Sequence, residues 1–364
     1  MGLLSTVIDL DAIAHNTSWL KQQAGDAQLM CVVKADAYNH GADRVAGVMA
    51  AHGADQFGVA TLREALRLRA SGISQPVLAW VWEPGQDVEP AIDAGIDLGL
   101  PGLEHVERVV RLGRPARVAL KVDTAMSRAG VVEADWDRAF SLLVDAPHVT
   151  VSGLFTHFAC ADVPEDPLND LQIERFHRAI ARAREFGLEV PVNHMANSPA
   201  LLTRPDARFD LVRPGIALYG CNPVPGLDTP LRPAMRWESR VTVTKCISAG
   251  DGVSYGQTWQ APTDGRVAVV ACGYADGLPR AIQGNLEVLI GSQRFPQVGR
   301  VCMDQVVVWL GEDASVQPGD RAVLFGSGAE GEMTADDFAD ALGTINYEVI
   351  CSPHGRTTRT YVGG

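Results

Sequence analysis

The sequence predicts an α/β TIM barrel followed by a mostly β domain. Between residues 10 and 220, eight short apolar runs alternate with helix-like stretches, a pattern typical of repeated βα units. After about residue 230, strand-like runs are instead separated by Gly, Asp and Pro turns. A doubly wound open sheet gives a similar alternation and is the alternative interpretation of the first part of the chain.

The eight predicted barrel strands are apolar runs that each end in polar or Gly-containing residues. They cover residues 29–33, 56–59, 77–81, 96–98, 117–122, 150–158, 192–195 and 211–219. Helical signals lie between them. Thr61 and Glu64 form a capping box at the start of one helix. Ile173, Phe176 and Ile180 repeat at helical spacing in another.

A proline-rich linker at Pro225, Pro230 and Pro233 separates the two parts of the chain. We therefore expect a barrel domain over residues 10–228 and a second domain over 229–364, which the N-terminal strand 1–9 joins. The strands expected in the second domain cover 239–247, 265–272, 286–290, 301–310 and 321–325. One helix, capped by Thr334, is expected after them.

The composition excludes several classes of protein. A chain of 364 residues with 46% hydrophobic and 21% charged residues is typical of a globular protein of two domains. The net charge of −13 disfavours nucleic-acid binding, and no apolar run is long enough to span a membrane. Seven scattered cysteines without a CxxC spacing indicate reduced thiols in the cytoplasm. The nine histidines show no metal-ligand spacing, so we expect no catalytic metal.

The first predicted strand ends at Lys34, directly after a buried-type apolar run. Active sites of TIM barrels lie at the carboxyl ends of the strands. A lysine that is desolvated there has a lowered pKa, which suits nucleophilic or Schiff-base chemistry. A lysine that extends out of the mouth into water is the structural alternative.

Further cationic side chains follow later strands. Lys121 and Arg128 lie at the end of the fifth strand, His157 in the sixth and Arg213 in the eighth. Each has a structural alternative: a core histidine, a surface ion pair or a salt bridge between loops. Their coincidence at successive strand ends favours a common site.

A phosphate-binding segment is predicted after strands seven and eight. Ser198 begins a short helix-like stretch, and Gly215 and Ile216 offer backbone N–H groups. Barrels commonly bind phosphate at this position. One lysine, a phosphate site and extra cations within one mouth fit pyridoxal 5′-phosphate (PLP).

A second glycine-rich segment, GSGAEG at 326–331, matches the GxGxxG pattern of dinucleotide-binding loops. It lies in the predicted β domain without the second parallel strand of a βαβ unit. We therefore do not expect a dinucleotide site there.

The segment VVKADAYNHG at 32–41 resembles the PLP-lysine segment of bacterial alanine racemases. Further blocks follow in the order of that family: KVDT at 121–124, RPGIALYG at 213–220, VSYG at 253–256, GYADG at 273–277, GRVCMD at 299–304 and YE at 347–348. The resemblance covers nearly the whole chain. It implies PLP as the cofactor and a homodimer with active sites shared between subunits.

The resemblance also implies the catalytic pair. Lys34 would bind PLP covalently and act as the base on the D-face of the substrate, and Tyr255 of the neighbouring subunit would be the base on the L-face. Both groups have reference pKa values near 10, so each can return a proton if the site depresses both. The protein would then interconvert L-alanine and D-alanine, supplying D-alanine for peptidoglycan or serving D-amino-acid catabolism.

The remaining roles follow from the same resemblance. Arg128 and the backbone N–H of Met303 would bind the substrate carboxylate. Arg213 would hydrogen-bond the pyridine nitrogen, with His157 behind it. The phosphate would be held by Tyr38, Ser198, Gly215, Ile216 and Tyr347, and the supporting residues would be Lys121, Tyr274 and Asp304.

Three residues depart from the family pattern: Asn39 stands where glycine is expected, and Ala125 and Ser127 stand where glycine is common. Three alternative functions remain. One is a broad-specificity racemase of small amino acids. A barrel-type PLP decarboxylase typically uses an acidic residue at the ring nitrogen, where this chain has Arg213. A non-enzymatic PLP-binding protein would need no second domain.

Overall fold

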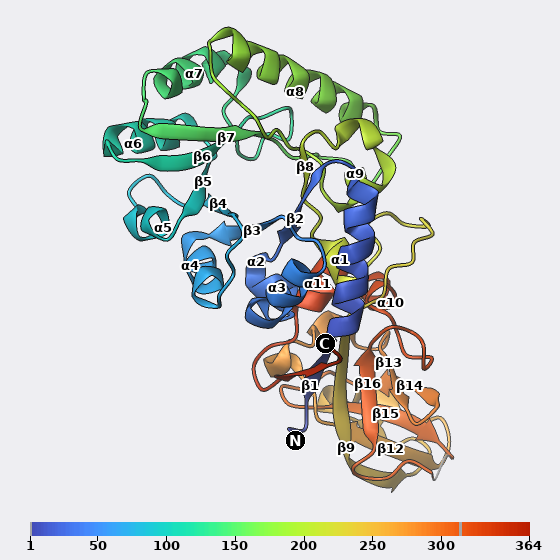
Figure 1. Cartoon of the computed structure of the whole chain (residues 1–364). Helices are drawn as coiled ribbons and strands as arrows, with labels where there is room; N and C mark the ends of the chain where they lie inside the picture. The colour runs from blue at the N-terminus through green and yellow to red at the C-terminus, as the bar shows by residue number, and fades with distance from the viewer. Residues whose placement is uncertain (1, 313–314) are drawn as a thin grey trace.

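The computed structural model describes residues 2–312 and 315–364. An α/β barrel and a β-rich sheet lie end to end (Figure 1). Strand β1 (Ser5–Asp9) belongs to the β-rich sheet and leads directly into helix α1 (Leu10–Ala24), which runs along the barrel. The N-terminal segment therefore connects the two parts of the molecule.

The barrel sheet contains seven strands in the order β7-β6-β5-β4-β3-β2-β8, all paired in parallel. Their bounds are β2 (Gln28–Val32), β3 (Gln56–Thr61), β4 (Val77–Val81), β5 (Ile96–Leu100), β6 (Ala116–Lys121), β7 (Val149–Phe155) and β8 (Leu211–Val212). The first six agree closely with the predicted strands. Parallel strands buried on both faces need continuous apolar runs, which is why the sequence identifies them.

Residues 192–196 close the barrel between β7 and β8. The His194 N–H donates to the Leu154 carbonyl at 3.0 Å, and the Arg213 N–H donates to the Ala196 carbonyl at 2.8 Å. The barrel prediction is therefore confirmed, and the open-sheet alternative is wrong. The predicted strand 192–195 is wrong as a regular strand, because only an isolated bridge joins His194 to Phe155 there.

The predicted strand 211–219 is too long. β8 stops at Val212, and a 3-10 helix, η3 (Ile216–Tyr219), follows. Pro214 has no N–H to donate to a neighbouring strand, and Gly215 provides the bend into η3.

Eleven helices cover the barrel and its junction with the second sheet in the described residues. Besides α1 they are α2 (Lys34–Asn39), α3 (Ala42–Ala51), α4 (Leu62–Ala70), α5 (Glu89–Asp93), α6 (Leu103–Leu112), α7 (Trp136–Val144), α8 (Pro167–Glu185), α9 (Ser198–Thr203), α10 (Ala335–Leu342) and α11 (Asn346–Cys351). The predicted capping box is confirmed, because Thr61 and Glu64 satisfy each other's backbone N–H groups. The Thr334 cap is confirmed in the same way with Asp337.

The second sheet contains eight strands in the order β12-β15-β14-β13-β16-β9-β1-β17. Apart from β1 they are β9 (Met235–Ile247), β12 (Gly265–Val270), β13 (Glu287–Ile290), β14 (Gln293–Val298), β15 (Val306–Gly311), β16 (Arg321–Phe325) and β17 (Thr358–Val362). β1 pairs antiparallel with β9 and parallel with β17, so both ends of the chain lie in this sheet. The domain limits at residues 228 and 229 stay a prediction.

The predicted strand 301–310 is too long at its start, since β15 begins at Val306. The carbonyl groups of Cys302 and Met303 instead accept the N–H groups of Tyr274 and Ala275, so this backbone holds a loop rather than a neighbouring strand. Strands β14 and β17 were not predicted. Half or more of the residues in each strand are polar, which leaves too few apolar positions for a strand signal.

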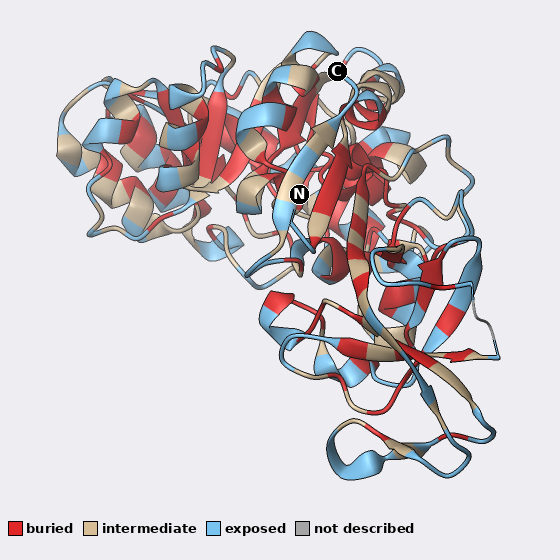
Figure 2. Cartoon of the chain, turned by 90° about the horizontal axis from the view of Figure 1, so that it is seen from below, coloured by how far each residue is buried: buried red, intermediate tan, exposed pale blue. Residues whose placement is uncertain are grey.

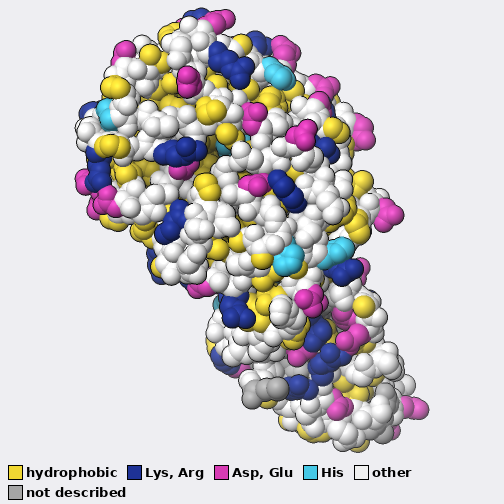
Figure 3. Space-filling model, viewed as in Figure 1, with side chains coloured by type: hydrophobic (Ala, Val, Ile, Leu, Met, Phe, Trp, Pro, Cys, Tyr) yellow, Lys and Arg dark blue, Asp and Glu magenta, His cyan; other side chains and the backbone are white. Residues whose placement is uncertain are grey.

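The buried segments gather along the barrel strands and the adjacent half of the second sheet (Figure 2). The far half of β9 is largely exposed, with Val243 at 46% exposure. On the face in Figure 3, acidic and basic side chains are interspersed rather than grouped by charge. Among the described helices, none combines the length and apolarity needed to cross a bilayer.

The glycine-rich segment 326–331 is closed by an acidic side chain of its own chain. The buried Glu332 carboxylate accepts the backbone N–H groups of Gly328 and Glu330, both at 2.9 Å. The donors that such a loop would offer to a phosphate are therefore already paired.

Candidate active site at the mouth of the barrel

Lys34 stands on a turn of unusual backbone conformation. It follows β2, and residues 35–39 all have positive φ, between 49° and 65°. A left-handed conformation costs about 1 kcal/mol or more for each residue other than glycine. The turn is held at its start by Glu64, whose carboxylate accepts the Ala35 N–H at 2.7 Å. Strain of this kind persists only where surrounding contacts determine the backbone, and it is most frequent at functional sites.

The Lys34 amine is half-buried, and its pKa is lowered. Burial is the main cause, and the positive charge of Arg128 adds to it. The amine lies 5.8 Å from the centre of the Tyr38 ring. A larger neutral fraction at working pH makes Lys34 a better nucleophile and base than an exposed lysine.

Arg213 is buried and surrounded by acceptors that carry no negative charge. Its guanidinium bonds the Nδ1 of His194 at 2.7 Å and the carbonyls of Thr156 at 2.5 Å and Met195 at 3.2 Å. His157 lies farther, with its Nδ1 at 3.5 Å. Burial lowers the pKa of Arg213 to about 9, so it stays charged at neutral pH.

Both histidines are kept neutral beside Arg213. Burial and then the Arg213 charge hold the pKa of His157 and of His194 well below the usual value. A neutral ring can accept a hydrogen bond from Arg213, so His194 fixes the orientation of the guanidinium. From the sequence we expected His157 at this position and did not identify His194. The signal that could have identified His194 was its place in the next predicted strand, 192–195, which neighbours the one that ends near His157.

Lys121 is the last residue of β6, and Arg128 lies in the loop that follows it. Burial, then Arg128 and Arg213, lower the pKa of Lys121 to about 8. Arg128 is exposed and has no hydrogen-bond partner among the described residues. Lys121 and Arg128 are both cationic in the free chain, so they repel rather than bind one another.

The loop before Arg128 explains two departures from the family pattern. Ala125 and Ser127 have φ values of 109° and 55°, which are usually adopted by glycine. The carboxylate of Asp123 accepts the N–H groups of residues 125–127, at 3.0 to 3.2 Å. Asp123 therefore stabilises a backbone conformation that usually requires glycine.

The predicted phosphate-binding residues come together beside this cationic cluster. The Ser198 hydroxyl accepts the Gly215 N–H at 2.8 Å, which brings the start of α9 against η3. A Cβ on Gly215 would lie 2.4 Å from the Tyr38 hydroxyl, so no larger residue fits there. Tyr347 lies 6.2 Å from Tyr38, measured between ring centres.

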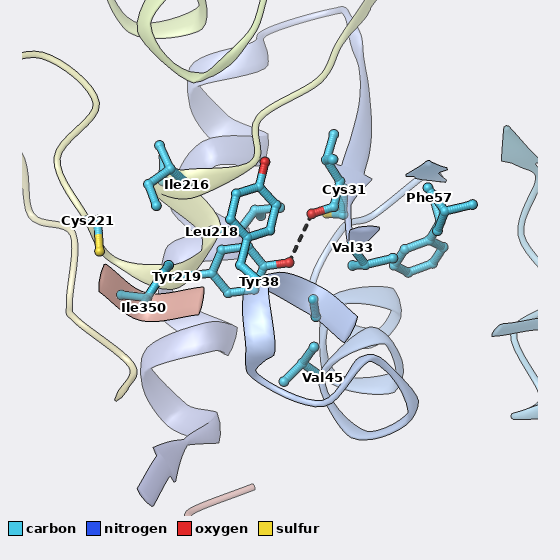
Figure 4. Close-up of a cluster of buried hydrophobic side chains, with 14 of the residues drawn as sticks. Cys31, Val33, Tyr38, Val45, Phe57, Ile216, Leu218, Tyr219, Cys221 and Ile350 are labelled. Carbon is cyan, nitrogen blue, oxygen red and sulfur yellow. Dashed lines mark hydrogen bonds between the residues drawn. The ribbon is translucent and has the colours of Figure 1, made fainter. Parts of the chain in front are cut away.

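Tyr38 itself is fixed by packing. Figure 4 shows its ring against that of Tyr219, with Ile216 on one side and Cys31 on the other. The two ring centres are 4.8 Å apart, and the Tyr219 hydroxyl donates to the Val32 carbonyl at 2.9 Å. Burial raises the pKa of Tyr38, so its hydroxyl stays protonated and can donate to an anion.

The charge of the mouth fits an anionic cofactor. Four cationic side chains are brought together: Lys34, Lys121, Arg128 and Arg213. None of them forms an ion pair with a carboxylate of the described residues. Buried positive charge is costly without a counter-charge. A phosphate and a substrate carboxylate would supply it, so these residues fit PLP.

The other predicted residues lie on the second domain and are exposed. The exposed fractions are 72% for Tyr255, 42% for Tyr274 and 52% for Met303. Tyr255 and Tyr274 line a hollow of about 490 Å³ whose other lining residues are Arg280, Arg300, Val301 and Cys302. In the described residues, no hydrogen bond or ring contact joins these three side chains to Lys34.

Arg356 holds the loops behind this hollow. Its guanidinium pairs with both oxygens of the buried Asp276, at 2.8 and 2.9 Å, and with Asp304 at 2.7 Å. These carboxylates belong to the loops that carry Tyr274 and Met303. Arg356 was not identified from the sequence, because its partners precede it by 80 and 52 residues.

Two family models match the chain. The model of the alanine racemase N-terminal domain matches residues 8–223, and that of the alanine racemase C-terminal domain matches residues 234–361. Among curated proteins, the alanine racemase of Corynebacterium efficiens is 59% identical over 100% of this chain and 99% of its own length. That of Mycobacterium tuberculosis is 50% identical over 99% of this chain and 96% of its own length.

Solved structures agree over the full length. The alanine racemase from Corynebacterium glutamicum has a TM-score of 0.91 and 53% identity, covering 100% of both chains. The enzyme from D-cycloserine-producing Streptomyces lavendulae has a TM-score of 0.97 and 41% identity, covering 100% of this chain and 98% of its own. The enzyme from Bacillus anthracis with bound L-Ala-P has a TM-score of 0.93 and 35% identity, covering 100% and 96%.

Proposed function

The chain belongs to the alanine racemase family, and we propose that it is an isomerase that interconverts L-alanine and D-alanine with PLP. The observation that carries this proposal is the half-buried Lys34, with its lowered pKa, among three further cations that have no carboxylate partner. A neutral lysine surrounded by positive charge suits covalent attachment of an anionic aldehyde cofactor.

PLP would be held by three groups of residues. Lys34 would form the covalent bond, and Arg213 would hydrogen-bond the ring nitrogen. The phosphate would be held by Tyr38, Ser198, Gly215, Ile216 and Tyr347. When bound, the cofactor withdraws electrons from the amino acid and makes its α-hydrogen acidic.

Two bases would move the α-proton on opposite faces of the substrate. Lys34 takes or returns it on the D-face, where its lowered pKa leaves a neutral amine to act as base. Tyr255 of the partner subunit acts on the L-face. The exposure of Tyr255 in one chain supports this assignment, because a catalytic tyrosine needs the burial that a second copy would provide.

Arg128 and the Met303 N–H would bind the substrate carboxylate. Lys121 would support Arg128. Its pKa of about 8 leaves part of the amine neutral, and addition of carbon dioxide to the neutral amine, with release of one proton to solvent, would give an anionic carbamate that pairs with Arg128. Tyr274 would narrow the entrance, and Asp304 would anchor the Met303 loop through Arg356.

Arg213 would determine the type of reaction. Its guanidinium remains charged, so it donates to the ring nitrogen and does not protonate it. The ring is then a weaker electron sink, which favours return of the proton to the α-carbon over transamination or decarboxylation. A decarboxylase would present an acidic residue there, and Arg213 has neutral histidines around it instead.

We also propose a homodimer that acts in the cytoplasm and supplies D-alanine for the cell wall or for catabolism. All seven cysteines are free thiols, which supports a reducing compartment. The exposure of Tyr255, Tyr274 and Met303 supports burial of this surface by a second copy.

The test is α-hydrogen exchange in deuterium oxide, with each alanine enantiomer and with PLP present. Wild type should incorporate deuterium while inverting both enantiomers. Tyr255→Phe should still exchange the α-hydrogen of D-alanine through Lys34, without inverting it, and should lose exchange of L-alanine. Tyr274→Phe serves as the comparison, because a lining tyrosine should affect the two enantiomers alike. Wild type that binds PLP but neither exchanges nor inverts alanine would refute the proposal.

A further inference from the structure

The C-terminal strand β17 contacts the turn that carries Lys34. The guanidinium of Arg359 donates to the Asp36 carboxylate at 2.8 Å and to the side-chain oxygen of Asn39 at 2.8 Å. Asp36 and Asn39 are the second and last residues of the left-handed run 35–39. Two donors from one planar group therefore fix the relative positions of both ends of this run.

Asn39 makes a second contact that glycine cannot make. Its side-chain NH₂ donates to the Pro353 carbonyl at 2.7 Å, while its oxygen accepts from Arg359. Its φ of 65° lies in the left-handed region, which asparagine tolerates better than most residues. Asn39 thus keeps the conformation that glycine would adopt and adds two bonds to the C-terminal segment.

Further contacts to the turn come from the barrel and from Tyr361 of β17. Asp36 accepts the Ala42 N–H at 2.9 Å and lies 3.4 Å from Arg67. A Cβ on Gly41 would lie 1.9 Å from the Tyr361 hydroxyl, so β17 also touches the turn beyond Asn39. The C-terminal strand is thereby the one element of the second sheet with hydrogen bonds to this turn in the described residues.

We propose that Arg359 and Asn39 are positioning residues for Lys34. Strand β17 pairs with β1 of the second sheet. Through Arg359 it stabilises the left-handed turn, and the turn sets the direction in which the Lys34 amine enters the mouth. The effect on PLP bound to Lys34 rests on the proposed function. The effect of Arg359 and Asn39 on the conformation of the turn does not depend on it. Neither side chain is among the residues that would bind substrate or cofactor.

The test compares full-length holoenzymes of wild type, Asn39→Gly and Arg359→Lys. A lysine keeps the charge of Arg359 but lacks the two separate, coplanar NH₂ groups that bond Asp36 and Asn39. Arg321→Lys is the matched control, because Arg321 lies on β16 of the same sheet, pairs with Glu330 and has a similarly exposed side chain. Three properties are measured: amide hydrogen exchange of residues 35–42, the pH midpoint of the visible absorbance of lysine-bound PLP, and thermal unfolding.

Arg359→Lys and Asn39→Gly should speed amide exchange in the turn by about tenfold, and they should shift the absorbance midpoint. Arg321→Lys should change neither. If both test variants match wild type in exchange and in midpoint, the inference is overturned. A wild type that does not bond PLP at Lys34 would refute the proposed function instead, and the exchange measurement would still decide the inference. A merely structural role predicts lower thermal stability with an unchanged midpoint, which would also overturn it.

Discussion

At the barrel mouth, a single chain already buries Arg213 and partly buries Lys34 and Lys121. Lys34, Lys121 and Arg213 all have lowered pKa values, and burial is the largest cause for each of them. On the second domain, Tyr255 and Met303 are more than half exposed. The difference supports the proposal that one half of the site is complete in a single chain, whereas the other half would be completed by a second copy.

The two halves of the site also differ in the residues that fix their backbone. The turn under Lys34 is fixed by Glu64, Asn39 and Arg359, and the loops near Met303 are fixed by Arg356. Residues 353–359 thus take part in both halves. Changes in this segment are expected to affect either the cofactor or the substrate, depending on which side chain is removed.

The largest effect is expected from Lys34→Ala. Loss of both the covalent anchor and one base should reduce racemisation by at least about 10³-fold. Chiral chromatography of the alanine product measures this loss. Lys245→Ala, which removes an exposed lysine of β9, should behave as wild type. Activity of Lys34→Ala within tenfold of wild type would rule out this lysine as the base.

Arg213→Glu tests the half that is buried in one chain. A carboxylate at this position would stabilise the protonated ring nitrogen by accepting its N–H, so transamination to pyruvate should rise relative to racemisation by about 10-fold or more. Arg213→Lys, which retains a positive charge, should show a smaller change. An unchanged ratio of pyruvate to inverted alanine in Arg213→Glu would contradict the role given to Arg213.

Arg356→Lys tests the exposed half. A lysine cannot pair with Asp276 through two parallel bonds and also reach Asp304, so the loops of Tyr274 and Met303 should loosen. The KM for alanine should rise about tenfold, while the visible spectrum of bound PLP stays the same. A changed PLP spectrum with an unchanged KM would mean that Arg356 acts on the cofactor half of the site, which would contradict its assignment to the loops of Tyr274 and Met303.

A fall in pH should lower the free energy of unfolding of the barrel, and this is the smallest of the expected effects. Burial lowers the pKa of His40 to about 4, and those of His157 and His194 are also lowered. Because the unfolded histidines titrate near 6.5, the folded state binds fewer protons below that pH. Its stability is complete above about 6.5 and falls towards pH 4, by roughly 1–3 kcal/mol for each such group.

Urea unfolding at about pH 7.5 and pH 5, at one protein concentration, measures this loss. His40→Gln should lose less stability between the two pH values than wild type does. His52→Gln, at an exposed position, should retain the wild-type dependence. Equal stability of wild type at both pH values would contradict the account of these histidines.

The sequence allowed most of the barrel to be predicted because its strands are local apolar runs. The errors lie where the backbone departs from a regular strand, at residues 192–196 and after Pro214. Residues 192–196, between β7 and β8, form only an isolated bridge, so they have no hydrophobic pattern of the kind that identifies a regular strand. The function of Lys34 could be inferred because it directly follows such a run and begins a recognisable block.

Long-range contacts account for what could not be predicted. The left-handed turn depends on Arg359, which is 320 residues from Asn39 in the chain. His194 became evident only because the closed barrel brings it to Arg213. No local pattern encodes these pairings, so only the folded chain reveals them.

The central claim is that each active site combines Lys34 of one chain with Tyr255 of the other. Lys34→Ala and Tyr255→Phe chains, each nearly inactive alone, can be unfolded together and refolded as mixed dimers with PLP. Random pairing should restore about one quarter of the wild-type racemase sites, because half of the dimers are mixed and one of their two sites is intact. Activity no greater than the sum of the two variants, in preparations shown to contain mixed dimers, would contradict the claim.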